Sequence, residues 1–218
     1  AEFCRLSMLM HVKQMTRRLA AQRAQRWERF RNSELRGKTL GIVGPGRIGQ
    51  AVAQRARCFE MSVLATRRRY APGAGLAHID QLYPPDGLRE MLARCDFVVL
   101  STSLSAETRG LIGEAELAVM KPGAFLINVS RGAVIDEAAL VRALEGGRLE
   151  GAALDVFERE PLPPTSPLWG LPNVIVTPHN AGGIREHAER ATALFCENLA
   201  RWLAGQPLEN AVDPQSGY

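Results

Sequence analysis

Six residues, Gly44-Pro45-Gly46-Arg47-Ile48-Gly49, stand between the apolar run Thr39–Val43 and a segment with helical periodicity, residues 47–58. Glycine at the first position permits a tight turn, at the second it lets the backbone approach a pyrophosphate, and at the third it lets the helix pack closely on the strand. The N–H groups at the helix start can then bind phosphates. This spacing alone is a weak signal, but the strand before it and the helix after it favour dinucleotide binding over a chance glycine turn.

The remainder of the chain alternates short apolar runs with segments of helical periodicity. Runs such as Phe97–Leu100 are apolar on both faces, which is typical of parallel strands covered by helices on each side. We therefore expect an α/β fold with a doubly wound parallel sheet (Rossmann-like) and flanking N- and C-terminal helices. The expected strands are residues 39–43, 61–66, 97–100, 124–129, 152–156 and 174–177. The expected helices are residues 1–23, 47–58, 88–94, 114–120, 136–145 and 184–204, with a proline- and glycine-rich loop at 67–87.

The first expected helix has one apolar face. Met8, Val12, Met15 and Leu19 recur at helical spacing along it. Such a methionine-rich face packs either on the core or on a second subunit. The pattern as a whole predicts an N-terminal linker helix and loop at 1–36, a dinucleotide-binding catalytic domain at 37–182, and a C-terminal helix and tail at 183–218.

Charge is distributed unevenly along the chain. Residues 1–69 carry 16 of the 27 lysines and arginines but only four of the 23 acidic residues. Such asymmetry can mark an arm that binds nucleic acid. The segment has no recognition-helix signature, however, so we expect no nucleic-acid partner. The alternative interpretation is a solvated basic helix beside a site for an anionic ligand.

Composition excludes several other classes of protein. With 46% hydrophobic residues the chain can build a core, which excludes wholesale disorder. No apolar run approaches the about 20 residues that span a bilayer, and no secretory signal is visible, so we expect no membrane association. The four cysteines form no Cys-x-x-Cys pair, which is typical of a reducing cytosol and argues against a disulfide framework or a metal site. We therefore expect a cytoplasmic protein without a bound metal.

The end of the second expected strand bears on which dinucleotide binds. NAD-binding folds usually place an acidic residue about 20 residues beyond the glycines, where it bonds the ribose hydroxyls. This chain has Thr66-Arg67-Arg68-Arg69 there, with no acid nearby. A carboxylate would repel a 2′-phosphate, whereas guanidinium groups can bind it in bidentate fashion. The sequence favours NADP(H) over NAD(H), with a solvated basic turn as the alternative.

Polar side chains follow three later strands at the point where each strand ends. In an open parallel sheet, ligands bind beyond the carboxyl ends of the strands, so these segments converge on one crevice. Arg131, Glu160 and His179 are suited there to hold an α-keto carboxylate and to move a proton. Singly, each has a structural alternative: an ion pair, a surface charge and a capping histidine. The three segments are residues 128–132, 154–161 and 177–182.

Longer motifs in a fixed order add a family resemblance. They are residues 41–49, 120–124, 128–137, 151–163, 168–179 and 208–213. With these motifs the chain resembles the D-isomer-specific 2-hydroxyacid dehydrogenase family, which includes D-lactate, glyoxylate, hydroxypyruvate and phosphoglycerate dehydrogenases. The resemblance implies an NAD(P)-dependent oxidoreductase that acts on CH–OH groups. It would transfer a hydride between NAD(P)H and a small 2-oxo acid or D-2-hydroxy acid, and Thr66 and Arg67 resemble the ribose position of NADPH-preferring glyoxylate/hydroxypyruvate reductases.

The resemblance also implies a role for each site residue. Arg131 would bind the carboxylate and carbonyl of the 2-oxo acid, and His179 would protonate the carbonyl oxygen as the hydride arrives. Glu160 would bond the imidazole and keep it able to donate a proton near neutrality, whereas Glu158 lies two residues too early. Asp155 would contact the nicotinamide carboxamide. The residues implied at the cofactor are Gly44, Gly46, Arg47, Ile48, Gly49, Thr66, Arg67, Arg68, Thr102, Val129, Ser130, Arg131, Asp155, His179 and Gly182.

Two residues and the N-terminus depart from the family pattern. Ser103 stands where the family usually has proline, and Asn180 replaces a usual apolar residue after the histidine. Family members begin with a substrate domain of about a hundred residues, whereas this chain starts at the helix that follows it. In family members that helix packs at the two-fold subunit interface, so the resemblance implies a homodimer. Without the substrate domain we expect cofactor binding with weak or absent turnover. Two alternatives stay open: a nucleotide-sensing, corepressor-like regulatory module, and an inactive fragment that lacks the substrate domain.

Overall fold

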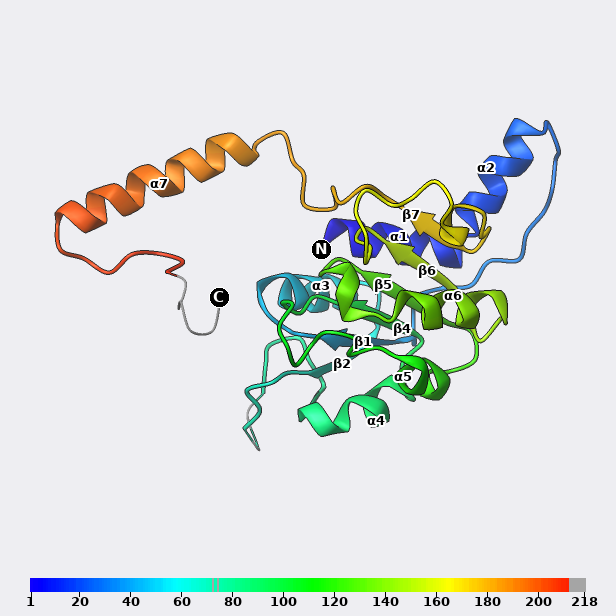
Figure 1. Ribbon diagram of the computed structural model, residues 1–218, viewed down its shortest axis with the longest axis horizontal. Helices are drawn as coiled ribbons and strands as arrows, with labels where there is room; N and C mark the ends of the chain where they lie inside the picture. Colours follow the sequence, from blue (N-terminus) through cyan, green and yellow to red (C-terminus); the bar gives the residue numbers. More distant parts are fainter. Residues whose placement is uncertain (72, 74, 212–218) are drawn as a thin grey trace. The chain divides into compact units, whose positions relative to one another are not determined.

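A parallel β-sheet organises the main part of the molecule (Figure 1). The computed structural model describes residues 1–71, 73 and 75–211. Among these residues, seven strands lie in the order β3-β2-β1-β4-β5-β6-β7, with parallel neighbours throughout. The expected doubly wound α/β fold is confirmed. The strands are β1 (Thr39–Val43), β2 (Ser62–Thr66), β3 (Gln81–Tyr83), β4 (Phe97–Leu100), β5 (Ala124–Asn128), β6 (Leu149–Leu154) and β7 (Val174–Val176).

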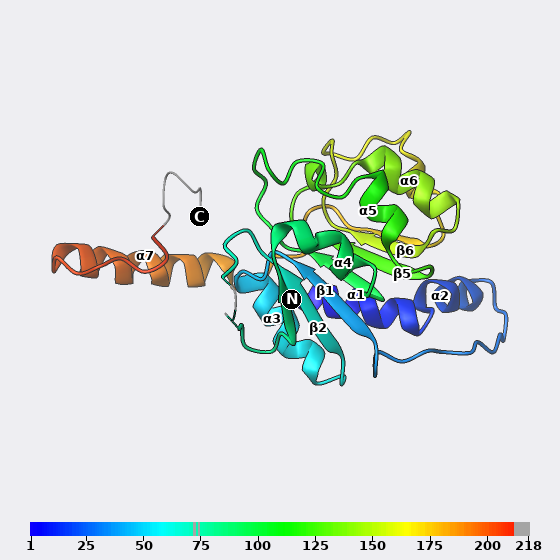
Figure 2. The same ribbon diagram turned by 90° about the horizontal axis from the view of Figure 1, so that it is seen from below.

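Helices cover both faces of this sheet (Figure 2). One face packs against α1 and α3, and the other packs against α4, α5 and α6. Successive side chains of a strand point to opposite faces, so in β4 Phe97 and Val99 face the first layer while Val98 and Leu100 face the second. The helices are α1 (Glu2–Val12), α2 (Met15–Arg23), α3 (Arg47–Arg57), α4 (Leu88–Leu92), α5 (Glu114–Val119), α6 (Glu137–Glu145) and α7 (His187–Leu203).

The strand order reverses between β1 and β4. From β1 the chain builds outward through β2 and β3, and it then returns to β4 on the other side of β1. The last residue of β1, Val43, is therefore paired with Thr66 of β2 and with Leu100 of β4. Ligands of doubly wound sheets bind at such a reversal, beyond the carboxyl ends of the strands. The glycine-rich turn begins at this position.

The expected helix at 1–23 is wrong in its continuity, because the structure divides it into α1 and α2. Gln14 between them has a left-handed backbone, with a φ of +50°. The side chains of Lys13 and Gln14 donate to the carbonyl oxygens of Ser33 and Arg31, at 3.0 and 2.6 Å. α1 buries its apolar face on the sheet, whereas α2 is held by hydrogen bonds to the segment that follows it in the chain. One straight helix could not make both sets of contacts.

The expectation that residues 67–87 form only a loop is also wrong, because this stretch contains β3. The strand pairs with Leu64–Thr66 at the edge of the sheet. Just before it, Asp80 accepts a hydrogen bond from the N–H of Val63 at 2.7 Å and pairs with Arg57. Three residues are too few to show a periodic pattern, so long-range contacts define this strand. β6 likewise begins at Leu149, three residues earlier than expected.

The chain divides into two compact units, Ala1–Ala181 and Gly182–Tyr218. Within the second unit, Arg201 of α7 pairs with Glu197 at 3.2 Å and with Glu209 at 2.8 Å. The motif at 208–213 ends with Val212 and Asp213, which lie outside the described residues. None of the helices in the described part of the chain is both long and apolar enough to cross a membrane.

Candidate active site

The glycine-rich turn joins β1 to α3 at the reversal of the strand order. Gly44 has a φ of +86°, and a Cβ on it would lie 2.7 Å from the Cα of Thr102. A Cβ on Gly49 would lie 2.8 Å from the carbonyl oxygen of Gly44. Only glycine fits at these two positions. Around Gly46, by contrast, no described atom beyond its chain neighbours lies within 4 Å of a Cβ, so a ligand can approach the backbone there.

The start of α3 lies directly after this opening. Gly46 is the N-cap, and Arg47 and Ile48 are exposed in the first turn. The first N–H groups of a helix have no partner within the helix, and the helix dipole is positive at this end. The turn therefore suits an anion such as a pyrophosphate. Gly44 itself is held by the neighbouring strands, because its N–H donates to Thr66 and its carbonyl oxygen accepts from Ser101.

The end of β2 presents the expected arginines. Thr66 is buried, and its hydroxyl donates to the carbonyl oxygen of Pro84 at 3.1 Å, so this side chain braces the edge of the sheet. Arg67 is half-buried, and its Nε is a buried donor without a hydrogen-bond partner among the described residues. Arg68 is exposed and lies 3.4 Å from Glu107. A buried donor without a partner is costly unless a ligand supplies the acceptor.

His179 and Glu160 are brought together beyond β7 and β6. Nδ1 of His179 lies 2.7 Å from Oε2 of Glu160, and Oε1 of Glu160 accepts from the N–H of Phe157 at 3.0 Å. Burial acts against the charged form of Glu160, but these hydrogen bonds and the positive charges of His179 and Arg131 outweigh it, so the pKa of Glu160 lies below its ordinary value. Glu160 is thus a carboxylate near neutral pH and can accept a hydrogen bond from Nδ1–H of the imidazole.

Arg131 lies in the turn that follows β5, and a buried asparagine shapes that turn. Oδ1 of Asn128 accepts from the N–H and the hydroxyl of Ser130, at 3.0 and 2.7 Å, and its Nδ2 donates to the carbonyl oxygen of Arg131 at 3.1 Å. A Cβ on Gly132 would lie only 1.8 Å from the carbonyl carbon of Phe157. This close approach brings the Arg131 turn against the segment that leads to Glu160.

Asp155 is buried beneath the His179 loop. Its carboxylate accepts from the hydroxyl of Thr177 at 2.6 Å and from the N–H groups of Asn180 and Ala181 at 2.9 and 2.8 Å. Its carbonyl oxygen accepts from the N–H of His179 at 2.8 Å. His179 itself has a left-handed backbone, with a φ of +51°. The carboxylate expected at the nicotinamide thus holds the loop that carries the histidine, with three of its lone-pair positions already used.

The structure places most of the expected site residues at one edge of the sheet. Gly44, Thr102, Arg131, Glu160 and His179 all follow the carboxyl ends of strands. Gly182 is the first residue of the second unit. Ser101 and Asn128 were not among the expected site residues. Both are polar residues inside or directly after an apolar strand. A polar group buried there needs a hydrogen-bond partner, and this could have identified both residues from the sequence.

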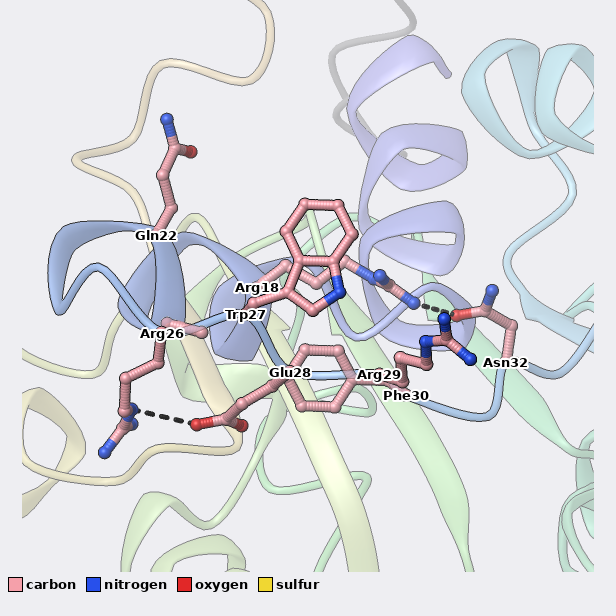
Figure 3. A pocket seen from close by; sticks show the side chains of 9 residues that line it. Arg18, Gln22, Arg26, Trp27, Glu28, Arg29, Phe30 and Asn32 are labelled. Carbon is pink, nitrogen blue, oxygen red and sulfur yellow. Dashed lines mark hydrogen bonds and ion pairs between the residues drawn. The ribbon is translucent and has the colours of Figure 1, made fainter.

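A hollow of about 630 Å³ elsewhere in the described part of the chain shares no residue with this site. Figure 3 shows it between α2 and the segment after it, with Trp27 and Phe30 among several arginines. This hollow is lined mainly by guanidinium groups and aromatic rings. The candidate active site is therefore identified by the chemistry of its residues and not by the volume of a hollow. Its lining residues are Arg18, Ala21, Gln22, Arg26, Trp27, Glu28, Arg29, Phe30 and Asn32.

Comparison with known proteins agrees with this geometry. A glyoxylate/hydroxypyruvate reductase B of Pectobacterium atrosepticum is 46% identical over 188 residues, which are 84% of this chain and 57% of the relative. The chain therefore spans little more than half the length of that relative. A D-isomer specific 2-hydroxyacid dehydrogenase of Xanthobacter autotrophicus Py2, solved with NADPH and MES, superposes with a TM-score of 0.88 at 37% identity, covering 100% of this chain and 88% of the other.

A second solved structure is as similar in fold. The NADPH-dependent glyoxylate/hydroxypyruvate reductase of Sinorhizobium meliloti, in complex with NADP and sulfate, gives a TM-score of 0.89 at 32% identity, covering 100% of this chain and 68% of the other. The family model described as "D-isomer specific 2-hydroxyacid dehydrogenase, NAD binding domain" matches residues 6–181. The chain therefore belongs to the D-isomer specific 2-hydroxyacid dehydrogenase family, through its NAD binding domain.

Proposed function

We propose that this chain carries the cofactor site and the catalytic side chains of a reductase of small 2-oxo acids, which in the reverse direction oxidises a D-2-hydroxy acid. The observation that carries the proposal is the 2.7 Å contact between Nδ1 of His179 and Oε2 of Glu160, with the charge of Arg131 acting on the same carboxylate. A cation for the substrate carboxylate and a proton donor for its carbonyl oxygen are the two groups that this reduction needs from a protein.

The side chains divide the reaction between them. Arg131 binds the carboxylate of the 2-oxo acid, while the contacts of Asn128 fix the backbone on which Arg131 stands. Glu160 accepts a hydrogen bond from Nδ1–H of His179, which leaves Nε2 available to the substrate. Protonated His179 then donates its Nε2 proton to the carbonyl oxygen, and Glu160 stabilises the imidazolium until that transfer. The reduced nicotinamide, when bound, supplies the hydride that reaches the carbonyl carbon.

The residues fit a dinucleotide with a 2′-phosphate. The open backbone at Gly46 and the start of α3 suit the pyrophosphate. The buried Nε of Arg67, without a partner among the described residues, supplies a donor where the ribose would lie. The Xanthobacter and Sinorhizobium proteins were solved with NADPH and NADP, respectively. We therefore propose NADP(H) as the preferred cofactor, ahead of NAD(H).

Two measurements test the proposed function. Calorimetric titration should show NADPH binding more tightly than NADH. The loss of NADPH absorbance with glyoxylate, hydroxypyruvate and pyruvate should show slow reduction of at least one of these acids, in keeping with the weak turnover expected from the sequence. His179→Ala should abolish the reduction and leave NADPH affinity nearly unchanged. A chain that binds neither dinucleotide contradicts the proposal, whereas tighter binding of NADH contradicts only the choice of cofactor.

We further propose that the protein is a homodimer, with α2 and the segment after it at the contact. Of the two positions expected for the apolar face of α1, the core or a second subunit, the structure shows the core, since this face is buried against the sheet and α3. Leu19 in α2 is 41% exposed and Trp27 is 93% exposed. Tryptophan and arginine are enriched among the interface residues that contribute most of the binding energy. This surface therefore supports a contact with a second copy better than α1 does.

A further inference from the structure

The carbonyl oxygen of Gly44 is held by a side chain from another strand. It accepts from the N–H of Gly46 at 2.8 Å, within the glycine-rich turn, and from the hydroxyl of Ser101 at 2.8 Å. Ser101 directly follows β4, and its own N–H donates to the carbonyl oxygen of Val43 at 2.9 Å. This backbone contact continues the pairing of β1 with β4, so the sheet fixes where the hydroxyl lies.

The hydroxyl also fills a corner between two glycines of the turn. A Cβ on Gly49 would lie 3.0 Å from Oγ of Ser101 and 2.8 Å from the carbonyl oxygen of Gly44. The next residue, Thr102, packs on the other side of Gly44, with its Cα 2.7 Å from the position of a Cβ there. Ser101 and Thr102, the two residues that follow β4, thus lie against two glycines of the turn.

From this geometry we propose that Ser101 is a positioning residue for the phosphate-binding turn. Its hydroxyl fixes the Gly44 carbonyl, so that the N–H groups at the start of α3 stay directed toward one position. The inference rests on the proposed function, since it takes this turn to bind a dinucleotide. Without the hydroxyl the turn has more conformations in the free protein, and ordering them on binding weakens the affinity.

The proposal makes the effect specific to one part of the ligand. Ser101 touches the turn that faces the pyrophosphate, whereas Arg67, at the end of β2, faces the 2′-phosphate in the proposed site. Loss of the hydroxyl should therefore lower the affinity for every ligand that contains a pyrophosphate, whether or not that ligand carries a 2′-phosphate. The affinity for a ligand that has only the 2′-phosphate should stay unchanged.

Calorimetric titration of Ser101→Ala against NADPH, NADH and adenosine 2′-monophosphate tests this. One hydrogen bond to a backbone carbonyl is expected to change the affinity by about threefold to tenfold. Both dinucleotides should bind that much more weakly to the variant, while adenosine 2′-monophosphate binds as it does to the unmodified chain. Ser62→Ala is the matched control, because Ser62 is exposed at the opposite end of β2. It should change none of the three affinities.

The outcomes separate this inference from the function on which it rests. Unchanged binding of NADPH and NADH by Ser101→Ala overturns the inference alone. An equal loss for all three ligands also overturns it, because that loss would mean general damage to the fold. If the unmodified chain binds neither dinucleotide, the proposed function fails first and this inference fails with it.

Discussion

The charge of Glu160 is the residue-scale feature on which the proposed chemistry most depends. Glu160→Gln keeps an oxygen that can accept a hydrogen bond from Nδ1–H of His179, but it removes the negative charge that stabilises the imidazolium. We expect the rate of 2-oxo acid reduction at neutral pH to fall by about 10²-fold, the lower range for general acid catalysis. Stopped assays of NADPH oxidation between mildly acidic and mildly basic pH measure this.

Glu158→Gln is the control for that variant. Glu158 lies two residues earlier and is exposed, and its backbone N–H donates to the side chain of Glu137 at 3.0 Å. Its side-chain charge should be dispensable, so the control should keep its rate. Equal rates for Glu160→Gln and the unmodified protein would show that the contact with His179 is only structural.

Arg67 should determine the preference between the two dinucleotides. Its buried Nε has no hydrogen-bond partner among the described residues, so a 2′-phosphate would supply a missing acceptor. Arg67→Ala should lower the affinity for NADPH by about tenfold or more, because the variant loses a charge-assisted hydrogen bond worth about 1.5–3 kcal/mol. NADH affinity, measured in the same titration, should change little and serves as the internal control. A parallel loss for both dinucleotides would assign Arg67 to a part that they share.

At the residue scale, the sequence predicts which side chains lie at the site better than what each one contacts. Gly44 and Gly49 could be identified because their requirement is local, a turn between an adjacent strand and helix. The contacts of Asp155 could not, because its partners Asn180 and Ala181 lie 25 and 26 residues further along the chain. Only the pairing of β6 with β7 brings those N–H groups onto the carboxylate.

The loop between β7 and the second unit is an element whose shape depends on that carboxylate. Asp155→Asn would turn an amide N–H₂ toward groups that are themselves donors, or leave one of them without an acceptor. We expect the free energy of unfolding, measured by denaturant titration, to fall by about 2–3 kcal/mol, since bonds to a buried charge are worth more than neutral ones. The rate of reduction should fall with it, because His179 lies in this loop.

Asp136→Asn is a matched change in a different setting. Asp136 caps α6 by accepting from the N–H of Ala139 at 2.9 Å, but it is exposed. Asparagine is about as good an N-cap as aspartate, so stability should be nearly unchanged. Similar losses for both variants would mean that Asp155 acts as an ordinary cap rather than as the buried support of the loop.

The docking of α1 depends on a histidine whose protonation the fold disfavours. The ring of His11 lies 4.3 Å from that of Phe125 and 5.8 Å from that of Phe97, and its Nε2 is 3.3 Å from Glu150. Burial lowers the pKa of His11, although Glu150 acts in the other direction. As the pH falls through about 6.5, the unfolded chain binds the proton first, so stability is lost on acidification.

Denaturant titrations near neutral pH and about one to two pH units lower test this linkage. The unmodified chain should lose stability on acidification, and His11→Phe should lose less of it. His187, exposed at the start of α7, offers a control, because His187→Phe should keep the same dependence as the unmodified chain. If all three proteins respond identically, the acid sensitivity comes from other groups.

At the scale of elements, most of the sheet and its helices could be predicted from local patterns. β1, β4 and β5 are short runs of four or five mainly apolar residues without alternation, which is typical of parallel strands covered on both faces. β3 and the break at Gln14 could not be predicted, because each depends on contacts with distant residues, Val63 through Asp80 in one case and Arg31 in the other. Local pattern specifies long elements, whereas tertiary contacts decide short ones.

At the scale of the whole molecule, the uneven charge has two proposed explanations. Residues 1–69 are strongly basic and the remainder is acidic on balance. Arg67 is assigned to a 2′-phosphate, but seven of the 14 arginines in residues 1–69 lie in α2 and the segment after it, and three of these line the hollow with Trp27 and Phe30. In a symmetric dimer a residue of one subunit can contact a different residue of the other, and the reciprocal contact forms on the other side of the two-fold axis. A basic arm can therefore contact acidic surface of the other subunit.

Trp27→Ala tests this arrangement, because an indole that is 93% exposed contributes little to the fold of one subunit. The unmodified protein should have the mass of a dimer in sedimentation equilibrium. Removal of a central interface tryptophan typically costs 2 kcal/mol or more of binding energy, so the dissociation constant should rise by about 30-fold or more. The melting temperature extrapolated to low protein concentration, where subunits separate, should stay the same. A mass unaffected by Trp27→Ala would place the contact elsewhere, and a monomeric unmodified protein would contradict the dimer altogether.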